Sequence, residues 1–422
     1  MTDFLKKKFA QGDEKTQSAE QHSSFLEKRP LRVYLIAGEP SGDLLGSRLM
    51  RALKKQEEGR VEFFGVGGET MKQQGLVSLF DIKDLAIMGL LEVVPSIPKV
   101  LSLLSKTMKD IEEKKPDVVL TIDSWSFSEQ IHKRILKKNL SVPHFHYVAP
   151  QAWAWKKGRA KKLGSLMEHV FALLPYEEAF FAPYGAQVTY VGHPVVEGGA
   201  SKGNRARFLE KHHLNKEDFI VCMLPGSRKT EVAALLPVFM QAAVLLKKRH
   251  PSLKIVLPTV DTIAKTVEQA VQKWPVPVLV VYGEEERYDA FSASKGAIAA
   301  SGTVSLELAM SGTPHLIAYK VSAVTAFLMR RFLKVKYVNL VNILQNEEIV
   351  PELLQEKATP EFIVETFEKI IQNEGEIQKN KMALALQKLG AGEVETPSQK
   401  AAKKLKQLLK ERRQKESFSF EN

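Results

Sequence analysis

Short apolar runs alternate along this sequence with segments of helical periodicity, and this alternation limits the fold more than any other feature. Residues 31–37 (LRVYLIA) and 219–224 (FIVCML) are typical of the apolar runs, which are bounded by glycine, proline or polar residues. A strand that is apolar along its whole length is buried on both faces of a sheet. Because strands that alternate with helices form parallel sheets covered by helices, the pattern predicts an α/β protein with doubly wound sheets.

The alternation occurs twice, and the glycine-rich segment 192–204 (GHPVVEGGASKGN) separates the two series. A chain of 422 residues is long enough for two domains that each bury a core. We predict a flexible polar extension at 1–30, an N-terminal domain at 31–194, a C-terminal domain at 195–370 and a helical basic tail at 371–422. The predicted strands lie at 31–37, 61–66, 117–122, 144–148, 169–173 and 188–191, and then at 219–224, 253–257, 278–281, 296–300 and 315–318.

The chain carries an excess of positive charge, with 61 Lys and Arg against 49 Asp and Glu and a formal net charge of +12. Such an excess favours an anionic partner, which composition leaves open as nucleic acid, an anionic membrane surface or a phosphorylated ligand. The single cysteine, Cys222, excludes an intrachain disulfide and a cysteine-based zinc site. The lack of a signal-peptide pattern and of an 18-residue apolar run indicates a cytoplasmic protein with no spanning helix.

Ligands of doubly wound folds bind where strands end and helices begin, and one such turn follows the strand at 219–224. There, Gly226 permits a close backbone approach, Ser227 can donate a hydrogen bond, and Arg228 can form a two-pronged contact with phosphate. A capped helix with solvated basic side chains is the alternative interpretation. The turn matches neither the dinucleotide nor the P-loop pattern.

A second turn of this kind follows the strand at 296–300. The hydroxyl groups of Ser301 and Thr303 and the open amides around Gly302 suit a phosphate at a helix start. Glu307, one turn further, could accept hydrogen bonds from both hydroxyls of a ribose. An N-cap followed by a helix-stabilising glutamate explains the same residues.

Two turns in the first half could also carry chemistry. The segment 38–43 (GEPSGD) follows the first strand and either holds an anion or sugar oxygen, or is a tight turn with Ser41 or Asp43 as the helix cap. Asp123 ends the strand at 117–122 and could act as a general base or cap the next helix.

Aromatic and basic residues are interleaved at 144–159 (HFHYVAPQAWAWKKGR), and residues 130–167 hold nine Lys and Arg with no acidic residue. Such a segment could bind nucleic acid or an anionic interface, although tryptophans at this spacing are more often partly core. An apolar stretch at 85–98 is either core or a lipid-contacting patch. Its candidate acyl-contact residues are Ile87, Met88, Leu90, Leu91 and Val94.

Seven motifs follow one another over about residues 31–355. They are AGEPSGD (37–43), LAIMGLLEV (85–93), HYVAPQAWAW (146–155), VGHP (191–194), LPGSRKTEV (224–232), ASGTVSLE (300–307) and NLVNIL (339–344). In this order they resemble the motifs of the lipid-A-disaccharide synthase family. The resemblance implies a GT-B fold, in which two Rossmann-like domains face a cleft and the C-terminal helices cross back to the first domain.

The resemblance also implies a reaction. UDP-2,3-diacylglucosamine and 2,3-diacylglucosamine 1-phosphate would give a β-1,6-linked tetraacyl disaccharide 1-phosphate and UDP, with inversion at the anomeric carbon. No DxD pair, the usual carboxylate clamp for a sugar-nucleotide metal, occurs in the sequence, so we expect neither a metal nor a cofactor. The family suggests a protein peripherally associated with the inner membrane and a homodimer with swapped C-terminal segments.

The family's motifs assign roles to individual residues. Asp123 is the candidate base, and Glu39 and Ser41 belong to the acceptor-side loop. Residues expected on the UDP-sugar side are Gly226, Ser227, Arg228, Ser301, Gly302, Thr303, Glu307, Asn342 and Gln355. The family commonly places a second Asp three residues after the first, where this chain has Ser126, and this puts in doubt any scheme that needs both carboxylates.

Two alternatives remain at this stage. One is another GT-B sugar-nucleotide enzyme, such as an epimerase or a transferase with a soluble acceptor. The other is a non-catalytic protein that binds RNA or a membrane. Phosphate-suited turns at two helix starts argue against the second, and the unopposed cations of 130–167, 321–345 and the tail after Lys400 favour an anionic membrane surface over nucleic acid.

Overall fold

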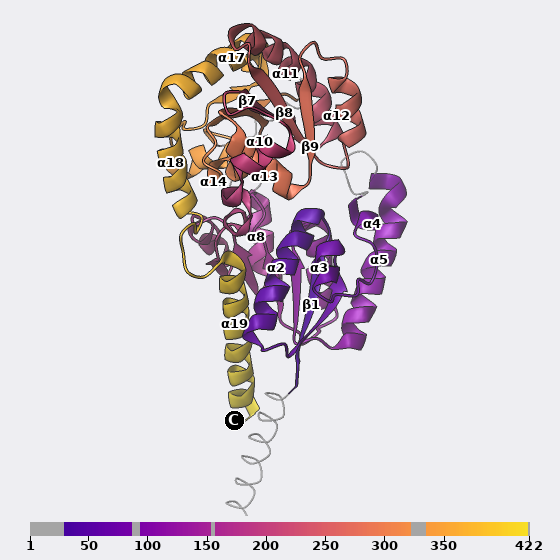
Figure 1. Cartoon of the computed structure of the whole chain (residues 1–422). Helices are drawn as coiled ribbons and strands as arrows, with labels where there is room; N and C mark the ends of the chain where they lie inside the picture. Colours follow the sequence, from indigo (N-terminus) through magenta and orange to yellow (C-terminus); the bar gives the residue numbers. More distant parts are fainter. Residues whose placement is uncertain (1–28, 87–92, 153–156, 322–334, 421–422) are drawn as a thin grey trace, which may run out of the picture. The chain divides into compact units, whose positions relative to one another are not determined.

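The computed structural model describes residues 29–86, 93–152, 157–321 and 335–420. The chain forms two compact units (Figure 1), the first made of Met1–Gly192 and Glu395–Asn422 and the second of His193–Val394. Each unit contains one sheet of six parallel strands, so the predicted α/β architecture is confirmed.

The sheet of the first unit has the strand order β2-β1-β3-β4-β5-β6. Its strands are β1 (Leu31–Ala37), β2 (Val61–Val66), β3 (Val118–Ile122), β4 (His144–Tyr147), β5 (His169–Ala172) and β6 (Val188–Tyr190). All six coincide with predicted strands to within one residue at either end. The helices are α2 (Pro40–Gln56), α3 (Glu69–Gln73), α4 (Lys83–Ala86), α5 (Val93–Lys114), α6 (Trp125–Lys137), α8 (Lys157–Leu166), α9 (Glu177–Phe181) and α19 (Pro397–Phe420).

Alternate side chains of β1 enter two different cores, one on each face of the sheet. Val33 and Leu35 pack with residues of α2 and α19, whereas Tyr34 and Ile36 pack with residues of α5 and α6. This division explains why the strand is apolar along its whole length, since a residue pointing to either face is buried.

The last helix, α19, belongs to the first unit although it follows the second in the chain. Its residues Ala401, Ala402, Leu405 and Leu409 are buried in the same core as α2, and Lys406 Nζ lies 2.6 Å from Glu57 Oε1. The predicted return of the C-terminal end of the chain to the first domain is therefore present for α19.

The sheet of the second unit has the order β12-β11-β10-β7-β8-β9. Its strands are β7 (Phe219–Leu224), β8 (Leu253–Thr259), β9 (Val278–Tyr282), β10 (Gly296–Ala300), β11 (His315–Tyr319) and β12 (Glu352–Leu354). Five were predicted, and the three-residue β12 was not. The helices are α10 (Arg205–Lys211), α11 (Lys229–Arg249), α12 (Ala264–Val271), α13 (Glu284–Ala293), α14 (Thr303–Met310), α16 (Leu340–Gln345), α17 (Pro360–Lys369) and α18 (Gly375–Gln387).

One helix of the second unit, α11, is long and apolar enough to cross a membrane by length and composition alone. Half of its apolar window is buried, and Leu235, Phe239 and Leu246 pack in the core of the unit. The position of α11 in the core accounts for its apolar composition. That composition is therefore weak evidence for a membrane span.

The chain passes between the units at Gly192–His193 and again at Val394–Glu395, whereas the sequence predicts boundaries after residues 194 and 370. The second difference has a physical cause in α18. Gln378 of this helix accepts a hydrogen bond from His315 N–H at 2.8 Å and donates to the carbonyl oxygens of His315 and Ile349, both at 2.9 Å. Residues 371–394 therefore stay with the second unit, and α19 alone joins the first.

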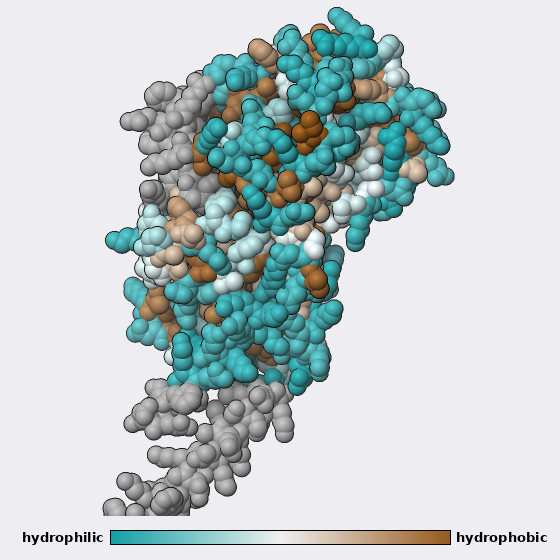
Figure 2. Space-filling model, turned by 90° about the vertical axis from the view of Figure 1, so that its left-hand side faces the viewer, coloured by the Kyte–Doolittle hydropathy of each residue, from teal (hydrophilic) through white to brown (hydrophobic). Residues whose placement is uncertain are grey.

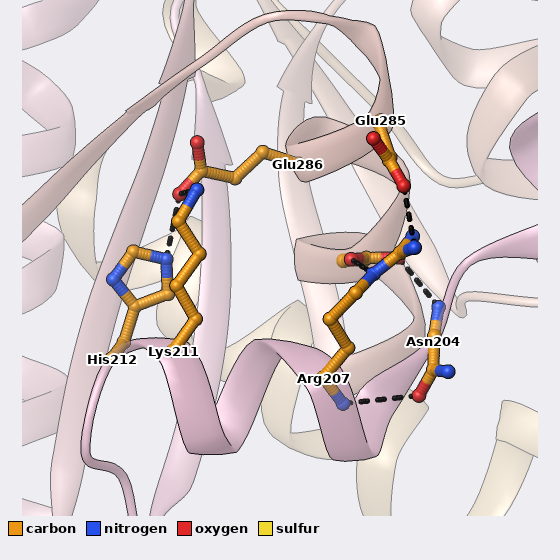
Figure 3. A network of polar contacts seen from close by, with 7 residues as sticks. Asn204, Arg207, Lys211, His212, Glu285 and Glu286 are labelled. Atoms are coloured by element: carbon orange, nitrogen blue, oxygen red, sulfur yellow. Dashed lines mark hydrogen bonds and ion pairs between the residues drawn. The ribbon is translucent and has the colours of Figure 1, made fainter.

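A polar network fastens α10 to one face of α13 (Figure 3). Arg207 pairs with Asp289 and Glu285, and the backbone N–H of Asn204 donates to Asp289 Oδ1 at 2.7 Å. Glu286 pairs with Lys211, the last residue of α10, and with His212, which directly follows it. These contacts join α10 to the helix that begins directly after β9.

Candidate active site

The two turns of the first unit that were predicted to carry chemistry meet at one edge of its sheet. β1 and β3 are neighbours in register, so the turn after β1 lies beside the turn after β3. The approach is close at Gly38, where an added Cβ would lie 2.6 Å from Ser124 Oγ. Only glycine fits there without displacing Ser124, and the structure thus brings Glu39 and Ser41 to the same edge as Asp123.

Asp123 occupies an unusual backbone conformation. It and Ser124 have φ values of 54° and 43°, two successive left-handed residues without glycine. The Asp123 N–H donates to the Tyr147 carbonyl at 2.9 Å, and Ser128 Oγ donates to the Asp123 carbonyl at 2.8 Å. Burial raises the pKa of the Asp123 carboxyl, opposed in part by the Ser124 backbone N–H. Strained backbone and a raised carboxyl pKa are both frequent at catalytic positions.

Glu39 and Ser41 are exposed at the start of α2, whereas Asp43 is buried and has a structural role. Asp43 accepts hydrogen bonds from the backbone N–H groups of Gly68, Thr70 and Met71 at 2.7, 2.9 and 3.0 Å. Asp43 therefore caps α3 rather than α2, which has no side-chain cap at Glu39.

A buried histidine network lies behind this edge, and our sequence argument did not single it out. Thr121 Oγ1 is 2.7 Å from His146 Nδ1 and 2.8 Å from His132 Nε2, and His132 Nδ1 is 2.9 Å from His144 Nδ1. Burial lowers the pKa of His146 to about 4, so these rings are neutral near pH 7. The available signal was the pair His144 and His146, two residues apart on an apolar strand and hence on one face.

In the second unit, β7 and β10 are neighbours, with Leu224 opposite Ala299. The two turns predicted to bind phosphate therefore lie side by side. Gly226 has a φ of 107°, and a Cβ there would lie 2.6 Å from Glu231 Oε2, so the turn requires glycine for both reasons.

Arg228 is the N-cap residue of α11, and its side chain is 77% exposed. Arg228 Nη1 lies 2.8 Å from Glu231 Oε1, and the Glu231 side chain is only 10% exposed. The pair joins an exposed guanidinium to a buried carboxylate, and the exposed guanidinium is accessible to a ligand. Ser227 is also exposed beside it.

Ser301 and Gly302 lead from β10 into α14, which begins at Thr303. Gly302, with a φ of 154°, is the N-cap residue, and no side chain caps the helix there. Glu307 lies one turn into α14, where its Oε1 is 3.1 Å from Arg287 Nη2 and 3.5 Å from the Tyr288 hydroxyl.

The structure separates the last two predicted residues. Gln355 directly follows β12, and its side chain contacts the backbone of Val321 just after β11, at the same edge as the phosphate turns. Asn342, in contrast, is fully buried. Its amide nitrogen donates to Val350 O and Glu352, and its oxygen accepts from the N–H groups of Ile349 and Val350, all at 2.7–2.9 Å. The amide has no capacity left for a ligand, so the structure gives Asn342 a role in holding this loop in place of the predicted substrate contact.

The predicted acyl-contact residues Ile87, Met88, Leu90 and Leu91 lie outside the described residues, and the side chain of Val94 is likewise not described. Where its residues are described, the face drawn in Figure 2 is mainly hydrophilic, with apolar side chains in small groups. Within the described ranges no three His, Cys, Asp or Glu side chains are placed to hold a metal ion.

Two Rossmann-like units, each with polar turns at the carboxyl edge of a parallel sheet, are characteristic of the GT-B fold. The UDP-GlcNAc 2-epimerase of Neisseria meningitidis, solved bound to UDP-GlcNAc, has a similar structure, with a TM-score of 0.58 over 91% of this chain and 100% of that chain. At 14% identity this likeness establishes the fold alone.

Sequence comparison is more specific. The family model for Lipid-A-disaccharide synthetase matches residues 33–408. The lipid-A-disaccharide synthase of Paramagnetospirillum magneticum is 48% identical over 374 residues, which cover 88% of this chain and 95% of that protein. The enzyme of Rhodospirillum centenum is 44% identical over 386 residues, covering 91% and 96%. The chain belongs to the lipid-A-disaccharide synthetase family, whose members are glycosyltransferases.

Proposed function

We propose that this protein is a lipid-A-disaccharide synthase. It transfers 2,3-diacylglucosamine from UDP-2,3-diacylglucosamine to 2,3-diacylglucosamine 1-phosphate, forming the β-1,6-linked tetraacyl disaccharide 1-phosphate and UDP. The observation that carries the proposal is the match at 44–48% identity over nearly the whole length of enzymes with this name. The turns at the two sheet edges supply groups that suit each half of the reaction.

The first unit supplies the acceptor side. Asp123 takes the proton from the 6-hydroxyl of the acceptor as that oxygen attacks the anomeric carbon of the donor. A carboxyl whose pKa is raised by burial is a stronger base than an ordinary aspartate. A single displacement of this kind inverts the anomeric configuration.

The second unit supplies the leaving-group side. As the bond to UDP breaks, negative charge grows on the diphosphate, where Arg228 and the amides at the start of α14 stabilise it. The neighbouring positions of the Gly226 and Ser301 turns support this assignment. The reaction then needs no metal, because a guanidinium and helix amides supply the positive potential.

We further propose that the enzyme works at the cytoplasmic surface of the inner membrane, without crossing it. Its substrates carry acyl chains, and a protein with a net charge of +12 is attracted to anionic lipid. A homodimer with swapped C-terminal segments would form by exchanging α19 between chains, since its core contacts with α2 can be made in trans.

Product analysis by mass spectrometry tests the function. The purified protein with the two diacyl sugars and EDTA should yield a disaccharide phosphate and UDP. Arg228→Ala should lower the rate at least a hundredfold while the fold survives. UDP release with only soluble acceptors would favour another GT-B enzyme, and no turnover with any acyl length would refute the proposal.

A further inference from the structure

Glu307, the candidate ribose ligand, is paired with Arg287 of a different helix and lies close to Tyr288 of that helix. Arg287 and Tyr288 lie on α13, whereas Glu307 lies on α14. Arg287 Nη2 is 3.1 Å from Glu307 Oε1, and the Tyr288 hydroxyl is 3.5 Å from the same oxygen. The single proton of the Tyr288 hydroxyl is donated to Glu284 Oε1 at 3.0 Å, which places a second carboxylate in the group.

The Arg287–Glu307 pair is withdrawn from solvent. The two side chains are 23% and 18% exposed, in contrast to the 77% of Arg228. Burial disfavours the charge on Arg287, yet the carboxylate of Glu307 prevails and raises the pKa of the guanidinium. The guanidinium also lies over the Tyr288 ring, with Cζ 5.1 Å from the ring centroid. These contacts restrict the orientation of both charged groups.

Such a pair answers an electrostatic difficulty at the nucleotide site. Glu307 lies four residues after Thr303, about 6 Å further along the helix axis. A carboxylate at that distance repels a diphosphate bound at the helix start. The Arg287 guanidinium, 3.1 Å from the Glu307 carboxylate, offsets this negative charge.

We propose that Arg287 is a positioning residue that presents the Glu307 carboxylate to the ribose of the nucleotide donor. Recognition of the sugar then depends on an arginine that acts through Glu307. The inference rests on the proposed function, because it assumes a UDP-linked donor. It assigns a role to a residue within the acidic run EEER (284–287), which resembles a solvated helix start in the sequence.

Calorimetric titration with UDP and with 2′-deoxy-UDP measures ribose recognition without the acyl sugars. The wild-type protein should prefer UDP by about tenfold or more, since a hydrogen bond to a charged group is lost with the hydroxyl. In Arg287→Met the preference should fall to within about twofold. Arg287→Lys keeps the charge and should restore part of the preference.

Kinetics and a second variant separate positioning from simple folding damage. Arg287→Met should raise KM for the UDP-sugar about tenfold and leave kcat within about twofold, because the interaction is uniform between ground and transition states. In a Glu307→Gln background, Arg287→Met should cause no further loss, since the two residues act as one unit.

Arg207→Met is the matched control. Arg207 pairs with Glu285 and Asp289, each two residues from Arg287 and thus about 200° around α13. The Arg207→Met substitution removes an arginine that pairs with carboxylates of α13, the helix that carries Arg287, and it should leave the ribose preference unchanged. An unchanged preference in Arg287→Met would overturn the inference, even if stability fell. UDP binding by the wild type without ribose preference would also overturn it, whereas no UDP binding would refute the proposed function itself.

Discussion

His315, at the start of β11, should make the second unit sensitive to acid. The side chain is fully buried, with Nδ1 at 3.0 Å from the Thr313 carbonyl and Nε2 at 2.7 Å from Ser305 Oγ. A carbonyl only accepts, so Nδ1 carries the proton and Nε2 accepts from the serine hydroxyl. Asn339 Nδ2 donates to the same hydroxyl at 2.7 Å, which fixes its direction.

Protonation of Nε2 would break this arrangement, and burial lowers the pKa of His315 to about 4, opposed by the hydrogen bond to Thr313. In the unfolded chain a histidine titrates near 6.5. The unfolded state therefore binds more protons between these values, and stability is full above pH 6.5 and falls as the pH drops toward 4. For one such histidine the loss between pH 7 and pH 5 is about 2 kcal/mol.

The variant His315→Gln keeps a hydrogen-bonding side chain but cannot titrate. It should be less stable than the wild type at pH 7, by about 1–3 kcal/mol for the lost hydrogen bonds. At pH 5 that difference should shrink by about 2 kcal/mol. Hydrogen exchange of the β11 peptide in urea at pH 7, 6 and 5 measures it, and reports on the second unit alone.

The exposed His213 provides the control. His213→Asn places a carboxamide at a surface position with a φ of 52°, which asparagine tolerates, and it shows over the same pH range what replacing an exposed histidine does to the stability. If the difference between His315→Gln and the wild type stays constant from pH 7 to pH 5, the argument that His315 is held neutral is refuted.

Three further predictions concern the first unit. Asp123→Asn should lower kcat at least a hundredfold, and a variant as active as the wild type would exclude Asp123 as the base. Because burial raises the pKa of Asp123, the kcat/KM of the wild type should fall on acidification at a higher pH than for an ordinary aspartate. Gly38→Ala places a Cβ 2.6 Å from Ser124 Oγ and should reduce activity about tenfold, because it displaces the Asp123 turn. In the control Gly158→Ala the added Cβ meets nothing within 4 Å, and the activity should not change. Equal activities of the two variants would contradict the close approach of Gly38 to Ser124. Leu405→Ala in α19 should destabilise the first unit by about 2–5 kcal/mol in urea unfolding and the exposed Lys410→Ala by less than about 0.5 kcal/mol; equal effects would show that α19 contributes little to that core.

The strands were predictable because their apolar runs encode burial on both faces. β12 was missed because its three residues include Glu352, whose carboxylate accepts from the N–H groups of Val338 and Asn339. No local sequence pattern predicts that the hydrogen-bond partners of a carboxylate lie more than ten residues away in the chain. The membership of α18 was missed for a related reason, since the contacts of Gln378 with β11 decide it.

The candidate site divides in the same way. Turns after strands were predictable, because glycine and small polar residues at strand ends have few other uses. Asn342 was misjudged because its four partners come from residues 349–352, which the sequence does not link to it. Arg287 was overlooked because neighbouring acids made it look like one member of an exposed charged helix.

The composition of the first unit from two separate stretches of chain has a consequence for biosynthesis. The strands of its sheet are complete by Gly192, but Leu405 and Leu409, which close its core, are added more than 200 residues later. At about 5–20 residues per second, the nascent first unit waits about 10–40 s with that apolar surface of α2 uncovered. During this interval the second unit is synthesised and can fold. The first unit therefore emerges first but completes its core last. A transient chaperone contact would be most useful on the face of α2 that α19 later covers.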